Sequence, residues 1–241
     1  MKVLSIGNSF SQDAHKWLHE LAKKNGVDLQ VANLYIGGCS LETHWENIKG
    51  ENSYYEYELN GENTGETLSI NEALKRNKWD VITVQQVSGL SGIFETYEPY
   101  ISSILATIKE FQTQAKIFFH QTWAYEQDSK HVDFVRYNNS QTYMFECIKN
   151  ASNKVSETFN IRLIPTGKVI QTLRETLPIF NYKNTGNSLC RDGFHLSFDY
   201  GRYAAAAVWF RTLTGEKVKI PNVQNFDTEI LRQILSVVNE I

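Results

Sequence analysis

Two short segments near opposite ends of the sequence carry residues that could perform nucleophilic catalysis. In the first, Ser9 follows the apolar run 3–6 and a glycine, and a helical pattern follows it. In an open α/β sheet, ligands bind beyond the carboxyl ends of the strands, so a serine at such a turn faces the crevice. Serine is a weak nucleophile at neutral pH and needs a base. The alternative is that Ser9 or Ser11 caps the helix. The same Gly-Asn-Ser tripeptide recurs at 186–188 without a preceding strand.

The second segment is the loop sequence that contains Asp192 and His195. A carboxylate and an imidazole three residues apart can meet, which fixes the imidazole tautomer and leaves its other nitrogen free to take a serine proton. The alternative is an ordinary Asp-Gly turn before a helix. Serine after the first strand, followed by Asp and His before the last helix, is a recurrent order for a hydrolytic triad. The two segments therefore support each other.

Alternating strand and helix signals predict an α/β fold in which helices cover a parallel sheet. Strands are expected at 2–6, 28–34, 80–85, 116–120 and 161–165. Helices are expected at 14–25, 97–113, 138–159, 169–176 and 197–213.

Two stretches interrupt this alternation. Between 45 and 77, an alternating Tyr-rich run at 53–59 precedes the hairpin signal Asn60-Gly61, and 67–70 could form the return strand. We expect this insertion to lie over one end of the sheet. The polar and aromatic stretch 121–137 is expected to be a loop rather than core. The whole chain, 1–241, is expected to form a single domain.

The chain resembles the SGNH (GDSL-like) hydrolase superfamily and, more narrowly, its branch called DUF4886. The resembling segments run in order over nearly the whole chain: 6–11 (IGNSFS), 37–41 (GGCSL), 79–85 (WDVITVQ), 122–124 (TWA), 164–167 (IPTG) and 192–197 (DGFHLS). The resemblance implies a flavodoxin-like three-layer α/β/α sandwich with a central parallel five-stranded sheet, and ester hydrolysis. In it, Ser9 matches the nucleophile, His195 the general base and Asp192 the acid that orients the base.

The resemblance also implies an oxyanion hole with three donors. Ser9 matches the family's first donor, its own N–H, and Gly38 matches the glycine after the second strand, with Gly37 as the register alternative. The superfamily's usual third donor, an Asn in a Gly-x-Asn-Asp block, is missing here. Gln85 resembles the Gln of the narrower branch, and Gln86 remains an alternative because strand register decides which side chain faces the site. A strand-end Gln could instead bond only the local backbone.

Further residues are candidates for contacts with a substrate. His120 and Trp123 follow the strand at 116–120, so both are expected at the rim of the crevice, where Trp123 could stack on a sugar or pack within the loop. Asn8 stands where the GDSL name implies Asp, and Asn8 and Gln86 are the other candidates. The expected protein is a serine esterase that removes a small acyl group, such as acetyl, from a carbohydrate or related ester. A non-catalytic carbohydrate-binding relative and an acyltransferase are the alternatives.

Composition excludes several other classes. With 24 Lys and Arg against 27 Asp and Glu, the net charge of −3 argues against a strongly basic nucleic-acid binder. No apolar run approaches the roughly 20 residues of a membrane helix. No signal peptide is evident, so a cytoplasmic location is expected, and a removed leader would be compatible with the sequence. The expected partner is a small-molecule or carbohydrate ester, with neither nucleic acid nor membrane.

No cofactor or metal site is expected. The three cysteines are too few and too scattered for a disulfide scaffold or a Cys-rich zinc site. His15 and His19 stand four apart on the first predicted helix, a spacing that could bind zinc, but no third ligand is evident. We expect these two histidines on a solvated helix face.

Overall fold

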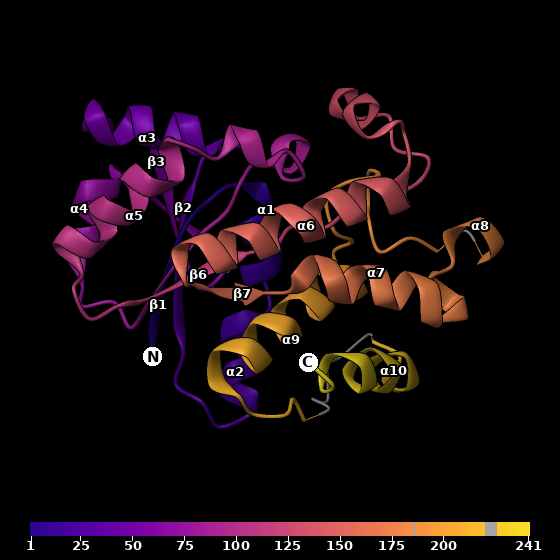
Figure 1. Ribbon diagram of the computed structural model, residues 1–241. Helices are drawn as coiled ribbons and strands as arrows, with labels where there is room; N and C mark the ends of the chain where they lie inside the picture. The colour runs from indigo at the N-terminus through magenta and orange to yellow at the C-terminus, as the bar shows by residue number, and fades with distance from the viewer. Residues whose placement is uncertain (186, 220–225) are drawn as a thin grey trace.

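A seven-stranded sheet lies between two layers of helices in the computed structural model, which describes residues 1–185, 187–219 and 226–241 (Figure 1). The strand order is β4-β3-β2-β1-β5-β6-β7. The strands are β1 (Lys2–Gly7), β2 (Gln30–Tyr35), β3 (Tyr55–Leu59), β4 (Glu62–Leu68), β5 (Val81–Val84), β6 (Lys116–His120) and β7 (Arg162–Ile164). Strands β2, β1, β5, β6 and β7 are parallel, which agrees with the sequence prediction.

Helices cover both faces of the sheet. The α-helices are α1 (Ser9–His15), α2 (Leu18–Lys24), α3 (Leu41–Lys49), α4 (Ile70–Arg76), α5 (Tyr100–Phe111), α6 (Gln141–Phe159), α7 (Thr166–Thr176), α8 (Tyr182–Thr185), α9 (Tyr200–Thr214) and α10 (Thr228–Val238). Short 3₁₀ turns are η1 (Ser88–Leu90), η2 (Phe94–Thr96), η3 (Val132–Tyr137) and η4 (Pro178–Phe180). Helices α1, α2, α7, α9 and α10 share one core, α3, α4 and α5 share the other, and α6 contributes to both.

The two cores follow from the alternation of side chains along the parallel strands. Val3 of β1 packs with Val31 of β2 in one core. Leu4, the next residue, packs with Ala32 in the other. Because both faces are buried, these strands are mainly apolar on both faces, with buried polar exceptions at Ser5, Asn33 and Thr83. The sequence signal of short continuous apolar runs therefore identified them correctly.

The hairpin of the insertion extends the sheet instead of lying over its end, so the sheet has seven strands rather than five. Strand β3 pairs antiparallel with β2, with Ala32 opposite Leu59, and β4 pairs with β3. The turn at Asn60-Gly61 has positive φ at both residues, as a two-residue hairpin turn requires. The physical reason for the difference is that β2 would otherwise present an unpaired edge, which the Tyr-rich strand covers.

Several element boundaries also differ from the prediction. The expected helix 14–25 is divided into α1 and α2, and α1 begins immediately at Ser9. Helix α9 begins after Asp199, whose side chain accepts from the N–H of Tyr200, rather than at Ser197. The stretch 121–126, expected to be a surface loop, is buried. Helices α3, α4, α8 and α10 lie outside the ranges expected to be helical.

Within the described ranges, none of the helices combines the length and the apolar character needed to cross a membrane.

Three histidines are almost completely buried: His15, His44 and His120. The prediction that His15 lies on a solvated helix face is wrong, because its Nε2 lies 3.0 Å from Ser5 Oγ and its ring packs edge-on against Trp209. Burial lowers the pKa of each of the three histidines to about 3, from an ordinary value of 6.5.

Because these histidines are buried in their neutral form, we expect the folded protein to lose stability in mild acid. Between pH 6.5 and 3 the unfolded chain binds protons that the folded chain excludes, so stability is complete above about pH 6.5 and falls as the pH approaches 3. Each histidine contributes at most about 1.4 kcal/mol per pH unit to this slope. Urea unfolding at pH 7, 6, 5 and 4 measures it. We expect a shallower slope in His44→Asn, and an unchanged slope would contradict this assignment.

Candidate active site

Ser9 occupies the first turn of α1, directly beyond the carboxyl end of β1. The helix is capped by its neighbours: Asn8 Oδ1 accepts from the N–H of Phe10 at 3.0 Å, and Ser11 Oγ accepts from the N–H of Asn8 at 3.0 Å. Ser11 Oγ also donates to Asn33 Oδ1. Capping therefore does not occupy the hydroxyl of Ser9, and of the two serines only Ser11 has the capping role.

The Ser9 hydroxyl begins a hydrogen-bonded chain to a histidine and an aspartate. His195 Nε2 lies 2.9 Å from Ser9 Oγ, and His195 Nδ1 lies 2.7 Å from Asp192 Oδ2. With the Nδ1 proton directed to the carboxylate, Nε2 carries the lone pair that can accept the serine proton. Ser9 and His195, which are 186 positions apart in the sequence, are thus in contact.

The Asp192 carboxyl is held in its ionised form. Burial opposes ionisation, but the hydrogen bonds from the His195 ring and from the N–H groups of His195 and Phe194 outweigh it and hold the pKa of Asp192 below its ordinary value. The loop that provides these bonds turns at Gly193, whose φ is +88°. A side chain there would be strained and would meet Ser129, so the Asp-Gly turn is needed to bring the two N–H groups onto the carboxylate.

A buried carboxylate, Asp13, connects this loop to helix α1, which contains Ser9. Its oxygens accept from the backbone N–H of Leu196 at 2.8 Å, from Arg191 Nη1 at 3.0 Å and from Arg202 Nε at 2.7 Å. Asp13 lies one helical turn after Ser9, and its side chain is completely buried. Sequence reasoning missed it. A signal was present, since an aspartate four residues after the serine lies on the same side of a helix.

Ser9 and His195 line a cavity of about 440 Å³ at the carboxyl ends of β1, β2 and β5. Its wall is formed by Asn8, Ser9, Phe10, Tyr35, Gly37, Gly38, Val87, Ser88, His131, Asp133, Phe194 and His195. In the part of the chain that the structure describes, no acceptor bonds the backbone N–H of Ser9 or of Gly38. These two N–H groups are therefore available to a ligand in the cavity. The N–H of Gly37, the register alternative, is also available, because Gly37 lines the cavity and its N–H has no acceptor in the described ranges.

Gln85 does not line this cavity. Its side chain is buried beneath Asn8, to whose Oδ1 its Nε2 donates at 2.6 Å, while its Oε1 accepts from His120 Nδ1 at 2.8 Å. The expectation that Gln85 reaches an oxyanion directly therefore needs correction, because its amide is engaged below the cavity floor. Gln86 is not the donor either: its Oε1 accepts from the N–H of Leu41, and its Nε2 donates to Thr96.

The two candidates from strand β6 and the loop after it are also core residues. His120 is fully buried between Gln85 and Thr166, whose Oγ1 lies 3.1 Å from His120 Nε2. Trp123 is fully buried as well, stacks on Phe10 at 4.1 Å and donates its indole N–H to the carbonyl of Phe194. Neither lies at the rim of the crevice, because the chain after β6 turns inward. Of the four substrate-contact candidates, only Asn8 lines the cavity.

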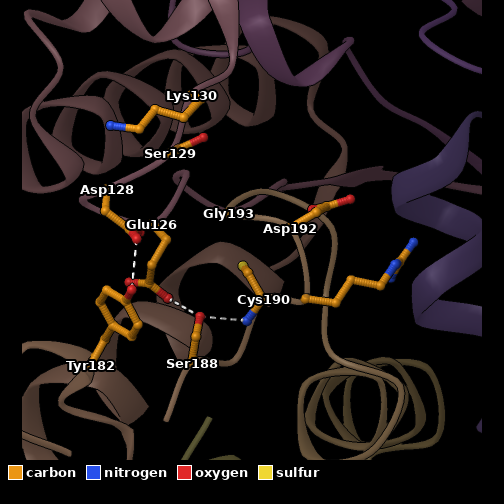
Figure 2. A pocket seen from close by; sticks show the side chains of 10 residues that line it. Glu126, Asp128, Ser129, Lys130, Tyr182, Ser188, Cys190, Asp192 and Gly193 are labelled. Atoms are coloured by element: carbon orange, nitrogen blue, oxygen red, sulfur yellow. Dashed lines mark hydrogen bonds between the residues drawn. The ribbon is translucent and has the colours of Figure 1, made fainter. Parts of the chain in front are cut away.

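A second cavity, of about 460 Å³, borders the Asp192 loop (Figure 2). Glu126 accepts from Ser188 in its wall, and Asp128 accepts from the hydroxyl of Tyr182 at 2.6 Å. In Figure 2 the Asp192 side chain points away from Tyr182, which agrees with its hydrogen bond to His195 on the Ser9 side. Neither Ser9 nor His195 lines this second cavity. Within the described residues, no group of three or more His, Cys, Asp or Glu side chains could hold a metal ion.

The three-layer α/β/α fold of this chain is similar to that of the SGNH hydrolases. A candidate SGNH hydrolase from Slackia heliotrinireducens superposes with a TM-score of 0.59 at 20% identity, over 88% of this chain and 98% of the other. The chain belongs to the DUF4886 family, described as a domain of unknown function, whose family model matches residues 2–231. A DUF4886 family protein from Bacteroides uniformis is 36% identical over 100% of this chain and 93% of its own, with a TM-score of 0.90.

A further solved structure shares the fold at lower identity. The acetylxylan esterase Axe2 from Geobacillus stearothermophilus is 13% identical over 91% of this chain and 97% of its own, with a TM-score of 0.58. At this identity the likeness concerns the fold alone. None of the curated proteins is significantly similar to the chain in sequence.

Proposed function

We propose that the protein is a serine ester hydrolase that works through an acyl-enzyme. The observation that carries the proposal is the chain of hydrogen bonds from Ser9 Oγ through His195 to Asp192, at the wall of a cavity. A serine hydroxyl bonded to an imidazole, which a carboxylate orients in turn, is the arrangement that activates serine as a nucleophile.

In the first half of the reaction, Ser9 Oγ attacks the ester carbonyl carbon while His195 Nε2 takes the hydroxyl proton. His195 then gives this proton to the leaving alcohol oxygen as its bond to the carbonyl carbon breaks. In the second half, water attacks the acyl-Ser9 ester, and His195 takes a proton from the water and returns it to Ser9 as the carboxylic acid leaves. Asp192 stabilises the imidazolium that forms in both halves.

The backbone N–H groups of Ser9 and Gly38 are the proposed oxyanion donors. Both residues line the cavity, and in the described ranges neither N–H is bonded to another acceptor. Backbone donors of this kind stabilise the negative charge of the tetrahedral intermediate at no cost of reorganisation. Gln85 supports this site from below by holding Asn8, the residue before the nucleophile.

The proposed substrate is an ester of a small acyl group, such as acetyl, on a carbohydrate or related alcohol. The fold shared with an acetylxylan esterase favours this class, as do the aromatic side chains of Tyr35 and Phe194 in the cavity wall. The test is hydrolysis of p-nitrophenyl acetate and p-nitrophenyl butyrate, with mass spectrometry of the rapidly quenched protein. We expect an acetyl mass increment on the peptide that contains Ser9 and a higher rate for acetate.

The two alternatives give different results in the same experiment. An acyltransferase would form the same acylated Ser9 but pass the group to an added sugar in preference to water. A non-catalytic carbohydrate-binding relative would neither release p-nitrophenol nor acquire the acetyl group. The absence of both signals over a range of esters would refute the proposed function.

Gln85→Ala separates a supporting role from a direct one. The substitution leaves the buried Nδ1–H of His120 without its acceptor and Asn8 without the amide that holds it. An unsatisfied buried donor costs about 1–3 kcal/mol, so we expect the free energy of unfolding to fall by that amount. We expect kcat to fall less than the 100–1,000-fold typical of a lost oxyanion donor. A loss of that size with unchanged urea unfolding would mean that Gln85 contacts the oxyanion.

A further inference from the structure

Two polar residues in the wall of the Ser9 cavity have no part in the proposed hydrolysis. His131 and Asp133 both line the cavity, and they come from the start of η3, far in sequence from the nucleophile and from the Asp192 loop. The rest of the wall includes the aromatic rings of Tyr35 and Phe194. The His131 ring packs edge-on against Phe194, with ring centres 4.7 Å apart. A donor and an acceptor therefore stand beside aromatic surface.

The hydrogen bonds of these two residues leave one donor and one acceptor free. His131 Nδ1 accepts from the backbone N–H of Asp133 at 3.2 Å, so a neutral His131 carries its proton on Nε2. Asp133 Oδ1 accepts from Arg136 Nε at 2.9 Å. Oδ2 lies 3.9 Å from His131 Nδ1, beyond hydrogen-bond distance, and no described residue donates a hydrogen bond to it. A hydroxyl group both accepts and donates, so it matches an imidazole N–H next to a carboxylate oxygen.

The Asp133 side chain and the end of η3 pack against η1 and the residues after it. A Cβ atom on Gly89 would lie 2.2 Å from Asp133 Oδ2, so only a glycine lets the carboxylate take this position. Tyr137, at the end of η3, donates its hydroxyl to the carbonyl of Gly89 and accepts from the N–H of Gly92. These contacts restrict the motion of η3 and of the Asp133 side chain, which lowers the conformational entropy lost when a ligand binds.

We propose that His131 and Asp133 bind hydroxyl groups of the substrate and so select esters whose alcohol part carries neutral hydroxyl groups on a ring, as in a sugar. We call these two residues the hydroxyl wall. The ion pair with Arg136 offsets the charge of Asp133, which favours a neutral hydroxyl over a cationic alcohol such as choline. Aromatic rings beside the wall suit the apolar face of a sugar ring. The inference rests on the proposed ester hydrolysis and adds the residues that select the alcohol part of the ester.

The experiment compares two acetyl esters of six-membered rings, a monoacetate of methyl xyloside and cyclohexyl acetate, which lacks hydroxyls. We expect the wild-type protein to prefer the xyloside ester in kcat/KM. In Asp133→Asn the ratio of the two kcat/KM values falls about 10–100-fold, as expected for a hydrogen bond to a charged group. The loss lies mainly in KM, because the hydroxyls are bound equally in the ground and transition states. In His131→Phe, which keeps a ring, the ratio falls about 2–10-fold.

The matched control is Asp128→Asn, on the same loop but in the wall of the second cavity (Figure 2), where Asp128 accepts from Tyr182. Its ratio should equal that of the wild type. An unchanged ratio in Asp133→Asn, or no wild-type preference for the xyloside ester, would overturn the hydroxyl wall while Ser9-dependent hydrolysis still stood. Acetylcholine as the preferred ester, lost in Asp133→Asn, would overturn it in favour of a cationic alcohol. Failure to hydrolyse any ester would refute the proposed function itself.

Discussion

Replacing Ser9 by alanine is expected to lower kcat on p-nitrophenyl acetate by about 10⁴-fold or more, because the members of a triad act as a unit. The hydroxyl that His195 contacts at 2.9 Å is removed, and no acyl-enzyme can form. The fold should be unaffected, since Asn8 and Ser11 make the capping hydrogen bonds of α1. The measurement combines kcat with urea unfolding and the acetyl increment on the Ser9 peptide, which should disappear.

The sequence provides a matched control in its second Gly-Asn-Ser tripeptide. Ser188 is described by the structure, whereas Gly186 lies outside the described residues. The Ser188 hydroxyl donates to Glu126 in the second cavity, away from Ser9. Ser188→Ala should therefore retain hydrolysis and the acetyl increment on Ser9. If Ser9→Ala kept the wild-type rate, the nucleophile would have to be sought elsewhere, and the assignment of the triad would be wrong.

Asp13→Ala is expected to cost about 3 kcal/mol of folding free energy and to reduce kcat about 100-fold. Removing one partner of a buried ion pair leaves the other charge uncompensated, and here Arg191 and Arg202 both lose their carboxylate. The N–H of Leu196, next to His195, also loses its acceptor. A displacement of about 1 Å in the reacting groups can cost 100-fold in rate. Urea unfolding and kcat together measure both effects.

A second substitution distinguishes a positioning role of Asp13 from a purely structural role. Asp13→Asn keeps an oxygen for the N–H of Leu196 but removes the charge, so kcat should recover more than stability does. Asp199→Ala is the control: it removes the cap of α9 and should cost about 1 kcal/mol with kcat nearly unchanged. If Asp13→Ala lost stability but kept kcat in the folded protein, Asp13 would not position the His195 loop.

Part of the candidate site and most of the sheet could be predicted from the sequence. Ser9, Asp192 and His195 could be found because each stands at a recognisable local signal, a strand-to-helix turn or an Asp-Gly turn before a helix. The parallel strands could be found because burial on both faces makes them short apolar runs. Strands β3 and β4 were recognised as a hairpin, but nothing local says which partner a hairpin will pair with.

Gln85, expected as an oxyanion donor, and His120 and Trp123, expected as substrate contacts, are absent from the cavity wall for one physical reason. Gln85, His120 and Trp123 lie at or after strand ends, where the sequence cannot tell a cavity wall from a buried polar network. Their hydrogen bonds to Asn8, Thr166 and the Phe194 carbonyl connect residues far apart in the chain. Such partners satisfy polar groups that burial would otherwise penalise, and only the packed structure shows that they are present.

The sequence by itself determined the α/β class and singled out Ser9, Asp192 and His195 as the proposed nucleophile, acid and base, because these signals are local periodicity and turn residues. Only the tertiary structure decided which polar residues face the cavity. It placed His131 and Asp133 in the cavity wall and buried Asp13 between two arginines. These positions depend on contacts between segments distant in the sequence, whose geometry is set by the packing of helices and loops around the sheet.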